Sequence, residues 1–314
     1  MLTELGNTGL VVSRIGLGLA ALGRPGYINL GHAGDIADTD ECAMEVAAHG
    51  VLDDAFGRGV RYFDAARSYG KAEVFLASWL RERELGPEDV TIGSKWGYTY
   101  TAGWRADAEV NEVKDLSVEK LRRQSSESLD LLGSNLRLYQ IHSATLDSGV
   151  LDDAAVRDEL ARLRANGLRI GLTVTGAGQA QTIERALEVG GFDTVQATWN
   201  LLERSAERAL AAAHDAGLGV IVKEALANGR LTERGGIPEL ADAAGRAEAT
   251  PDAVALAVAL AQRWADVVLS GAATAAQLDS NLAAAELTLE PRLLEELSED
   301  PATYWEKRSA LPWN

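Results

Sequence analysis

Eight short apolar runs recur along the chain, and a helical segment separates each run from the next. The runs lie near residues 15–19, 60–63, 90–94, 136–141, 168–173, 193–198, 219–222 and 266–270. They are mostly continuous rather than alternating, which is typical of strands covered on both faces. The segments between them carry apolar residues at spacings of three and four, as amphipathic helices do. Eight strands that alternate with helices favour a closed (β/α)8 barrel over a doubly wound open sheet.

The helical segments also carry the stop and start signals that helices require. Gly167, Gly190 and Gly217 fit C-terminal stops, and Thr250 followed by Pro251 fits an N-cap with proline at the first helical position. The length of 314 residues suits one barrel, since such barrels contain about 250 residues or more with insertions. No linker or low-complexity tract divides the chain, so we expect a single domain over residues 1–314.

Composition and charge exclude several classes of function. The formal net charge of −17 repels phosphate backbones and anionic lipid, and argues against nucleic acid as a partner. No apolar run approaches the roughly 20 residues of a membrane span, and the N-terminus lacks the features of a signal peptide. Cys42 is the only cysteine, so a disulfide framework within the chain is impossible, and we expect a cytoplasmic protein. Nothing in the sequence specifies an oligomeric state.

Four polar residues lie where predicted strands end and loops begin. Asp64 follows the second strand, with Tyr69 five residues beyond it, and Lys95 and His142 end the third and fourth strands. In a barrel, the carboxyl ends of the strands meet at one rim, which is where the chemistry of this fold takes place. Individually, the aspartate could cap a helix, and the tyrosine and histidine could be core residues. Their position on consecutive strand ends favours one shared site.

This set of side chains suits proton transfer. A free tyrosine has a pKa of roughly 10 and is a poor acid at neutral pH. A nearby ammonium such as that of Lys95 favours the phenolate, and a carboxylate such as that of Asp64 keeps the lysine charged and oriented. His142 can hydrogen-bond a substrate carbonyl oxygen or help to shuttle a proton. Together these groups could protonate an oxygen while hydride reaches the carbon.

The same phrases resemble those of the aldo-keto reductase superfamily, in particular its aldose-dehydrogenase-like branch. FDAARSYGKAE, GSKWG and LYQIHSA are similar to the family's aspartate–tyrosine, lysine and histidine strands, and LGNTGLVVSRIGLG to its N-terminal β-hairpin that closes the barrel bottom. The resemblance implies that Tyr69 is the general acid, that Lys95 lowers its pKa, that Asp64 pairs with Lys95, and that His142 orients the carbonyl. It also places the C-terminal tail, about 299–314, near the active-site face.

The resemblance implies a nicotinamide dinucleotide that lies extended across the barrel top, without a GxGxxG loop. NADP(H) is the cofactor expected for the family, and NAD(H) is the alternative. Thr173 and Val174 occupy the positions of a Ser-Asn pair that holds the nicotinamide carboxamide, and Gln196 would be the remaining partner. Lys223 replaces a tyrosine that often stacks on the nicotinamide. The segment that follows resembles the pyrophosphate loop, with backbone contacts expected from Leu226, Asn228 and Gly229, although an ordinary turn is an open alternative.

After the eighth strand, LSGAATAAQLDSNLAAA resembles the family's adenosine-phosphate segment. The matching residues are Ser270, Gly271, Gln277 and Asn281. Gln277 also fits a capping box that begins at Thr274, so a structural role for it stays open. Ala273 stands where NADPH-preferring members usually carry an arginine or lysine that pairs with the 2′-phosphate. The loss of that charge-assisted contact could shift the preference toward NADH.

Aromatic residues near the rim suggest the substrate pocket. Trp96, Tyr98 and Trp199 are expected to line it, although packing in the core is an alternative for each. Aromatic walls suit sugars, aryl aldehydes and cyclic ketones alike.

The sequence therefore predicts a nicotinamide-dependent enzyme that reduces an aldehyde, ketone or sugar carbonyl reversibly. An alternative is a cofactor-sensing protein on a reductase scaffold, which the changes at Val174 and Lys223 keep open. A metal-dependent barrel enzyme is a weaker alternative, because only one of the four histidines ends a predicted strand. We expect no metal site.

Overall fold

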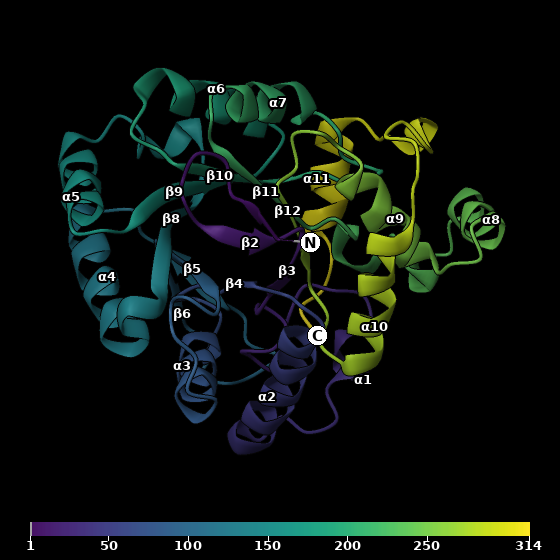
Figure 1. Ribbon diagram of the computed structural model, residues 1–314, viewed down its shortest axis with the longest axis horizontal. Coiled ribbons are helices and arrows are strands. Elements are labelled where there is room, and N and C mark those ends of the chain that lie inside the picture. The colour runs from purple at the N-terminus through teal and green to yellow at the C-terminus, as the bar shows by residue number, and fades with distance from the viewer. Residues whose placement is uncertain (1) are drawn as a thin grey trace.

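The eight apolar runs form the parallel strands of a closed barrel in the computed structural model, which describes residues 2–314 (Figure 1). Around the barrel the strands follow the order β10-β11-β12-β3-β4-β5-β8-β9. The predicted (β/α)8 fold is confirmed. The barrel strands are β3 (Ile15–Gly18), β4 (Tyr62–Asp64), β5 (Thr91–Trp96), β8 (Leu136–Ala144), β9 (Arg169–Val174), β10 (Thr194–Thr198), β11 (Gly219–Lys223) and β12 (Val267–Ser270).

The helices form a layer outside the strands (Figure 1). Those that follow successive strands are α2 (Glu41–Gly57), α3 (Ala72–Glu82), α4 (Val118–Leu132), α5 (Ala154–Ala165), α6 (Gln179–Val189), α7 (Glu207–Asp215), α9 (Pro251–Leu260) and α10 (Ala275–Ala283). Three more helices lie in connections or at the C-terminal end: α1 (His32–Asp35), α8 (Pro238–Arg246) and α11 (Pro301–Ser309).

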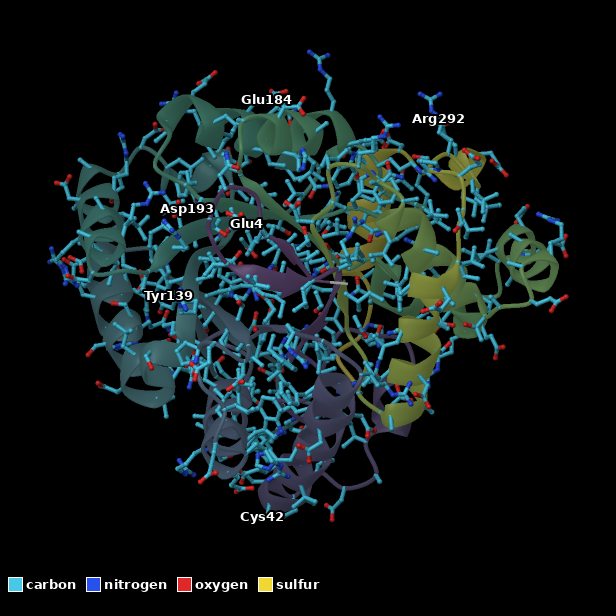
Figure 2. The ribbon with its side chains drawn as sticks, viewed as in Figure 1. Glu4, Cys42, Tyr139, Glu184, Asp193 and Arg292 are labelled. Atoms are coloured by element: carbon cyan, nitrogen blue, oxygen red, sulfur yellow. The ribbon has the colours of Figure 1, made fainter. Side chains whose placement is uncertain are left out.

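The predicted helix signals hold. The hydroxyl of Thr250 accepts a hydrogen bond from the amide of Ala253 at 3.4 Å, and α9 begins at Pro251. The glycines at 167, 190 and 217 all have positive φ, at 101°, 68° and 88°, which is the conformation that ends a helix. The single cysteine, Cys42, is exposed on α2 (Figure 2). Within residues 2–314, no helix is both long and apolar enough to cross a membrane.

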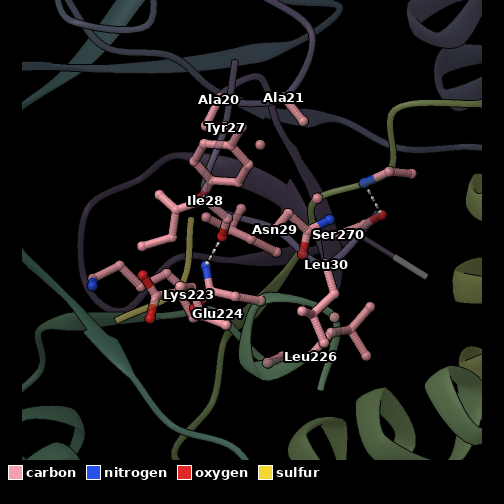
Figure 3. A pocket seen from close by; sticks show the side chains of 18 of the residues that line it. Ala20, Ala21, Tyr27, Ile28, Asn29, Leu30, Lys223, Glu224, Leu226 and Ser270 are labelled. Carbon is pink, nitrogen blue, oxygen red and sulfur yellow. Dashed lines mark hydrogen bonds between the residues drawn. The ribbon is translucent and has the colours of Figure 1, made fainter. Parts of the chain in front are cut away.

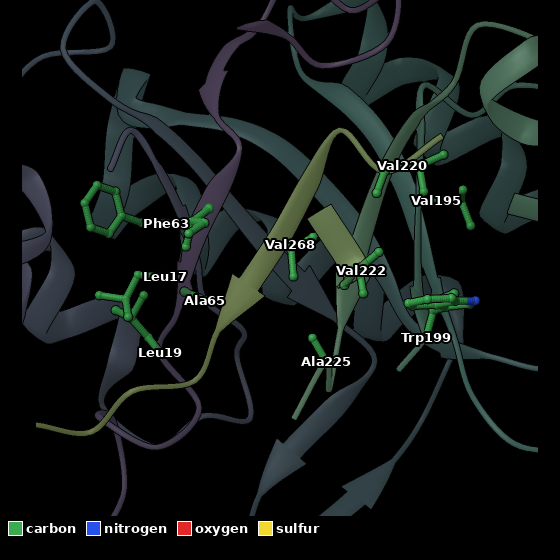
Figure 4. Packing of buried hydrophobic residues seen from close by; sticks show 14 of the residues in the cluster. Leu17, Leu19, Phe63, Ala65, Val195, Trp199, Val220, Val222, Ala225 and Val268 are labelled. Atoms are coloured by element: carbon green, nitrogen blue, oxygen red, sulfur yellow. The ribbon is translucent and has the colours of Figure 1, made fainter. Parts of the chain in front are cut away.

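Buried apolar side chains pack on both faces of the strands. Outward-facing residues such as Leu17, Phe63, Val195, Val220 and Val268 contact the helix layer and form the larger cluster (Figure 4). A second cluster fills the lower barrel interior. Its members are Leu5, Leu10, Val12, Tyr62, Leu138, Ile221, Val267 and Leu269.

An N-terminal hairpin supplies three members of that inner cluster. Strands β1 (Leu2–Glu4) and β2 (Val11–Ser13) pair in antiparallel fashion, and the turn between them reaches β11 (Figure 1). At Gly6, where φ is +50°, an added Cβ would lie 2.3 Å from the backbone nitrogen of Gly219, so the close approach requires glycine. The hairpin therefore closes the amino-terminal end of the barrel, and the opposite end is left for function.

Candidate active site

The structure brings Asp64, Tyr69, Lys95 and His142 together at the carboxyl ends of β4, β5 and β8. The Lys95 ammonium forms an ion pair with Asp64 and donates to the carbonyl oxygen of Ala65 at 3.0 Å. Its Nζ lies 3.3 Å from the hydroxyl of Tyr69. The rings of Tyr69 and His142 meet edge to face, with centroids 5.5 Å apart. The four side chains thus form one contiguous cluster, in which Lys95 lies below Tyr69.

Besides Lys95, Asp64 is held by donors from its own strand and from two other barrel strands. Its Oδ1 accepts hydrogen bonds from the hydroxyl of Tyr62 at 3.1 Å and from the amide of Gln196 at 3.0 Å. The amide of Gln140 lies at 3.4 Å from the same oxygen. A buried carboxylate needs such partners because its desolvation is costly. The ion pair and these donors fix the orientation of Lys95 toward Tyr69.

The pKa of Tyr69 is shifted in the direction opposite to that expected from Lys95 alone. Burial, followed by the negative charge of Asp64, raises the pKa of Tyr69 well above 10. Desolvation penalises the phenolate more than the nearby cations stabilise it. The side chain is therefore a neutral phenol that can give up a proton to an acceptor but does not ionise on its own at neutral pH.

His142 is also held in its neutral form. Burial, and then the positive charge of Lys95, lowers the pKa of His142 well below 6.5. The ring lies edge to face with Tyr98, with centroids 4.9 Å apart, and its Nδ1 has no hydrogen-bond partner. A neutral imidazole carries one N–H donor. The side chain can thus hydrogen-bond an oxygen in the cavity without bringing a positive charge to it.

These side chains lie at one end of a cavity of about 720 Å³. The cavity runs past Ile28, Leu30 and Leu226 (Figure 3) to α9 and α10, where it is lined by Thr250 and Asp252 at the start of α9 and by Ser280 in α10. Most of the residues expected at the site also line the cavity: Asp64, Tyr69, Tyr98, His142, Gln196, Lys223, Leu226, Asn228, Gly229, Ser270, Gly271, Gln277 and Asn281. Lys95 and Thr173 do not line the cavity but contact residues that do: Lys95 contacts Asp64 and Tyr69, and Thr173 contacts Ser143.

The expectation that Trp96 and Trp199 line the pocket is wrong. Both indoles are fully buried in the cluster between strands and helices. Successive side chains of a strand point to opposite faces, so Trp96 points away from the interior that Lys95 occupies. Trp199 packs edge to face on Trp264, with centroids 5.6 Å apart. Of the three predicted aromatic residues, only Tyr98 reaches the cavity.

Two residues predicted to hold a carboxamide are already engaged within the protein. The hydroxyl of Thr173 accepts a hydrogen bond from the amide of Ser143 at 2.7 Å. Ser143 lines the cavity and has a positive φ of 58°, so Thr173 supports a strained stretch of the cavity wall. The Gln196 amide nitrogen donates to Asp64, and its carbonyl oxygen is the group left for a ligand.

Lys223 and its neighbour form a charged cluster with the C-terminal helix. Lys223 donates to the hydroxyl of Thr198 at 3.0 Å, and Glu224, with φ of 53°, pairs with Arg308 at 2.5 Å. Burial lowers the pKa of Lys223 to about 8. Burial opposes ionisation of Glu224, but Arg308 and then Lys223 overcome it and lower its pKa to about 2. The pair between Glu224 and Arg308 joins the tail to the cavity.

Sequence reasoning missed Arg24, which lies beside the general-acid candidate. It is buried, pairs with Glu112 at 2.5 Å and lines the cavity. Its guanidinium lies 5.2 Å from the ring centres of Tyr69 and Tyr27 and 4.7 Å from that of Trp313. A signal was available, because Arg24 follows an apolar, glycine-rich strand end much as Lys95 ends its own strand.

The far end of the cavity carries the residues predicted for the adenosine phosphate. Asn281 donates to the hydroxyl of Ser270 at 2.8 Å. Gln277 accepts from the amide of Ala273 at 2.9 Å, while the hydroxyl of Thr274 accepts from the amide of Gln277 at 3.2 Å. Gln277 thus takes part in the N-terminal cap of α10, as the structural alternative expects, and it also lines the cavity.

The cavity fits an extended dinucleotide. Its volume lies within the range of about 300–1,000 Å³ usual for ligand sites, and polar groups line both ends. Asn228, at the middle of the cavity, has a buried Oδ1 without a hydrogen-bond partner and a left-handed backbone with φ of 55°. The N-terminus of α10 adds a favourable place for an anion. Among residues 2–314, no group of acidic, histidine or cysteine side chains could hold a metal ion.

Comparison with known proteins agrees with this geometry. The sequence matches the family model described as "Aldo/keto reductase family" over residues 14–299, and the chain belongs to this family. It is therefore an NAD(P)H-dependent oxidoreductase that acts on small-molecule carbonyl groups.

Several characterised and uncharacterised proteins are similar to it. An uncharacterised oxidoreductase, YrpG, from Bacillus subtilis is 30% identical over 246 residues, which cover 73% of this chain and 67% of that protein. L-galactose dehydrogenase from Arabidopsis thaliana is 27% identical over 90% of this chain and 87% of its own length. An NADH-specific methylglyoxal reductase from Escherichia coli is 28% identical over 73% of this chain and 68% of its own.

Solved structures share the fold. A putative aldo-keto reductase from Pseudomonas aeruginosa, PA4992, aligns with a TM-score of 0.68 and 26% identity, over 91% of this chain and 95% of its own. The aldo-keto reductase AKR11C1 from Bacillus halodurans aligns with a TM-score of 0.75 over 96% of this chain and 97% of its own. Its identity of 21% supports the fold alone.

Proposed function

We propose that the protein reduces an aldehyde, ketone or sugar carbonyl reversibly, with Tyr69 as the general acid. The observation that carries this proposal is the position of the Tyr69 hydroxyl on the cavity wall, 3.3 Å from Lys95 Nζ and next to His142. A neutral phenol holds the proton that a developing alkoxide needs. Lys95 stabilises the phenolate left after transfer, because a positive charge at this distance favours the ionised form.

The other two members of the cluster orient these groups. Asp64 keeps Lys95 charged and directed at Tyr69, and His142 donates a hydrogen bond that aligns the carbonyl oxygen. Such general acid catalysis contributes about 10²–10⁴-fold in rate. In the reverse direction, the phenolate form of Tyr69, stabilised by Lys95, would accept the proton of the alcohol hydroxyl while the hydride leaves its carbon for the oxidised cofactor.

A bound nicotinamide dinucleotide would supply or accept the hydride. We assign its nicotinamide end to the neighbourhood of Gln196 and Lys223, with Thr173 supporting the wall behind. Its pyrophosphate is assigned to Leu226, Asn228 and Gly229. Its adenosine end is assigned to the residues at the start of α10, which are Ser270, Gly271, Gln277 and Asn281.

The test is cofactor binding followed by turnover. NADPH and NADH are titrated against the intrinsic fluorescence of the seven tryptophans, one of which, Trp313, lines the cavity. Aldehydes, ketones and sugars are then screened by the absorbance of the reduced cofactor. If neither nucleotide binds at millimolar concentration, the proposal fails. Binding without turnover of any substrate would favour a cofactor-sensing protein instead.

A Tyr69→Phe variant tests the assigned acid. Phenylalanine keeps the contacts of the ring with His142 and Arg24, so cofactor affinity should be unchanged while kcat falls about 10²–10⁴-fold. Tyr100→Phe, on strand β6 (Tyr98–Tyr100) and outside the cavity lining, is the matched control and should retain activity. Equal activity of the two variants would remove Tyr69 from this role.

A further inference from the structure

Two loops meet over the middle of the cavity. One follows β3 and spans residues 26–36, and the other follows β11 and spans residues 226–236. The amide of Leu30 donates to the carbonyl oxygen of Asn228 at 3.0 Å, and the side-chain amide of Asn228 donates to that of Ile28 at 2.8 Å (Figure 3). These bonds join the loops on the side of the cavity that leads to α10.

An ion pair continues this junction toward the adenosine end. Arg234 in the second loop lines the cavity and donates to both carboxylate oxygens of Asp35 in the first, at 2.8 and 2.5 Å. It also donates to the carbonyl oxygen of Leu30 at 2.8 Å. Only 8% of the Asp35 side chain is exposed. A bidentate pair of this kind is geometrically specific, so it fixes the position of the carboxylate.

The carboxylate of Asp35 lies beside Arg234, which lines the cavity together with Gln277 in the first turn of α10. Burial raises the pKa of Asp35, but hydrogen bonding with Arg234 and Gln277 more than offsets this effect, and the pKa lies below its ordinary value. Gln277 in turn accepts a hydrogen bond from the amide of Ala273. The pair of Asp35 with Arg234 and the bond between Gln277 and Ala273 thus flank the same end of the cavity, where the sequence resemblance expects a cation for the 2′-phosphate.

No unpaired arginine lines the cavity within residues 2–314. Each of the three arginines in the lining is paired with a carboxylate, as Arg234 is with Asp35. Two further acidic residues line the cavity: Glu233, next to Arg234 in sequence, and Asp252 in α9, two residues after Thr250, whose hydroxyl lies 2.7 Å from that of Ser280 in α10. A dianionic phosphate entering this end would meet like charges, and like-charge juxtaposition disfavours binding. A ribose hydroxyl can instead donate a hydrogen bond to a carboxylate, which is how acidic residues select NAD in other folds.

We propose that Asp35 is a specificity-determining residue that selects NADH over NADPH. This inference rests on the proposed function and runs against the NADP(H) default of the family. Asp35 weakens NADPH binding in two ways. Its carboxylate repels the 2′-phosphate, and it neutralises Arg234, the cation best placed to bind that phosphate.

The test measures the dissociation constants of NADH and NADPH by isothermal titration calorimetry. The unaltered protein should bind NADH at least tenfold more tightly than NADPH. Asp35→Asn keeps the size of the side chain and an acceptor for Arg234 but removes the charge, so it should reduce this ratio at least tenfold, mainly through tighter NADPH binding. Asp215→Asn, in an exposed side chain at the end of α7, is the matched control and should leave the ratio unchanged.

Two more variants separate the possible outcomes. Arg234→Gln removes the cation and leaves Asp35 charged, so the ratio should rise. Ala273→Arg places a cation at the start of α10 and should tighten NADPH binding if the 2′-phosphate lies there. A ratio that Asp35→Asn does not change, or tighter NADPH binding by the unaltered protein, overturns this inference alone. Failure of both nucleotides to bind the unaltered protein overturns the proposed function together with it.

Discussion

Replacing Asp64 with asparagine should destabilise the protein severely, because it leaves Lys95 charged and unpaired inside the barrel. The side chains of Lys95 and Asp64 are only 1% and 2% exposed. Without the carboxylate, the ammonium retains one carbonyl oxygen at 3.0 Å and the hydroxyl of Tyr69 at 3.3 Å. Removal of one partner from a buried ion pair typically costs about 3–5 kcal/mol. The asparagine amide adds to this cost because it has one acceptor and one donor group. In one orientation its NH2 faces the Lys95 ammonium, and in the other it faces the donors of Tyr62 and Gln196.

Urea unfolding followed by tryptophan fluorescence measures the loss. The midpoint of Asp64→Asn should fall at an unchanged m-value, and the free energy of unfolding should drop by about 3–5 kcal/mol. Asp107→Asn removes an exposed carboxylate that pairs with Arg105 at the surface and should leave the midpoint unchanged. The double variant Asp64→Asn/Lys95→Met removes both charges and should recover much of the loss, which a double-mutant cycle quantifies.

One result would refute this reasoning. If Asp64→Asn loses less than about 1 kcal/mol at an unchanged m-value, the charge on Lys95 is not desolvated to the degree that its burial indicates. Lys95 would then stabilise ionised Tyr69 only as weakly as a solvated charge does.

Three further predictions concern the pKa shifts and the packing of the barrel. The folded-state pKa of Lys223, about 8, lies below its ordinary 10.5, so the unfolded chain binds more protons than the folded protein between these two pH values. The free energy of unfolding should therefore rise with pH over this window. Urea unfolding at several pH values measures this rise, which Lys223→Met should lack. Because burial and then Lys95 lower the pKa of His142 well below 6.5, NMR titration of the four histidines should find His142 still neutral where an ordinary histidine is protonated, and protonation near 6.5 would contradict this. Gly93→Ala would place a Cβ 2.5 Å from the hydroxyl of Tyr62, and should cost about 1–3 kcal/mol in thermal unfolding.

The fold and the centre of the site could be predicted from local patterns. Short apolar runs predict buried strands, and apolar residues at spacings of three and four predict helices with one buried face, so their alternation along the chain indicates a barrel. Lys95 and His142 were identified by their position at strand ends, and barrel topology alone brings strand ends to one rim. The prediction for Trp96 is wrong because proximity to Lys95 in sequence does not place two side chains on the same face; neighbouring side chains of a strand point to opposite faces.

Other features depend on contacts between distant segments, which no local pattern contains. Arg24 pairs with Glu112, Asp35 with Arg234, and Glu224 with Arg308. Each pair joins a loop to another loop, a hairpin or the tail, so its existence follows from the packed structure. The pKa of Tyr69 is a similar case, because burial outweighs the neighbouring cation and burial is a property of the whole barrel.

The N-terminal hairpin determines how protons can reach the reacting groups. Leu5, Leu10 and Val12 fill the lower opening together with Tyr62, and this apolar plug separates the barrel interior from water at that end. A cofactor and substrate seated at the opposite rim would cover that rim. In such a complex the ligands at one end and the hairpin at the other would separate Tyr69 from bulk water, so the hydration of the barrel interior would depend on whether ligands occupy the rim.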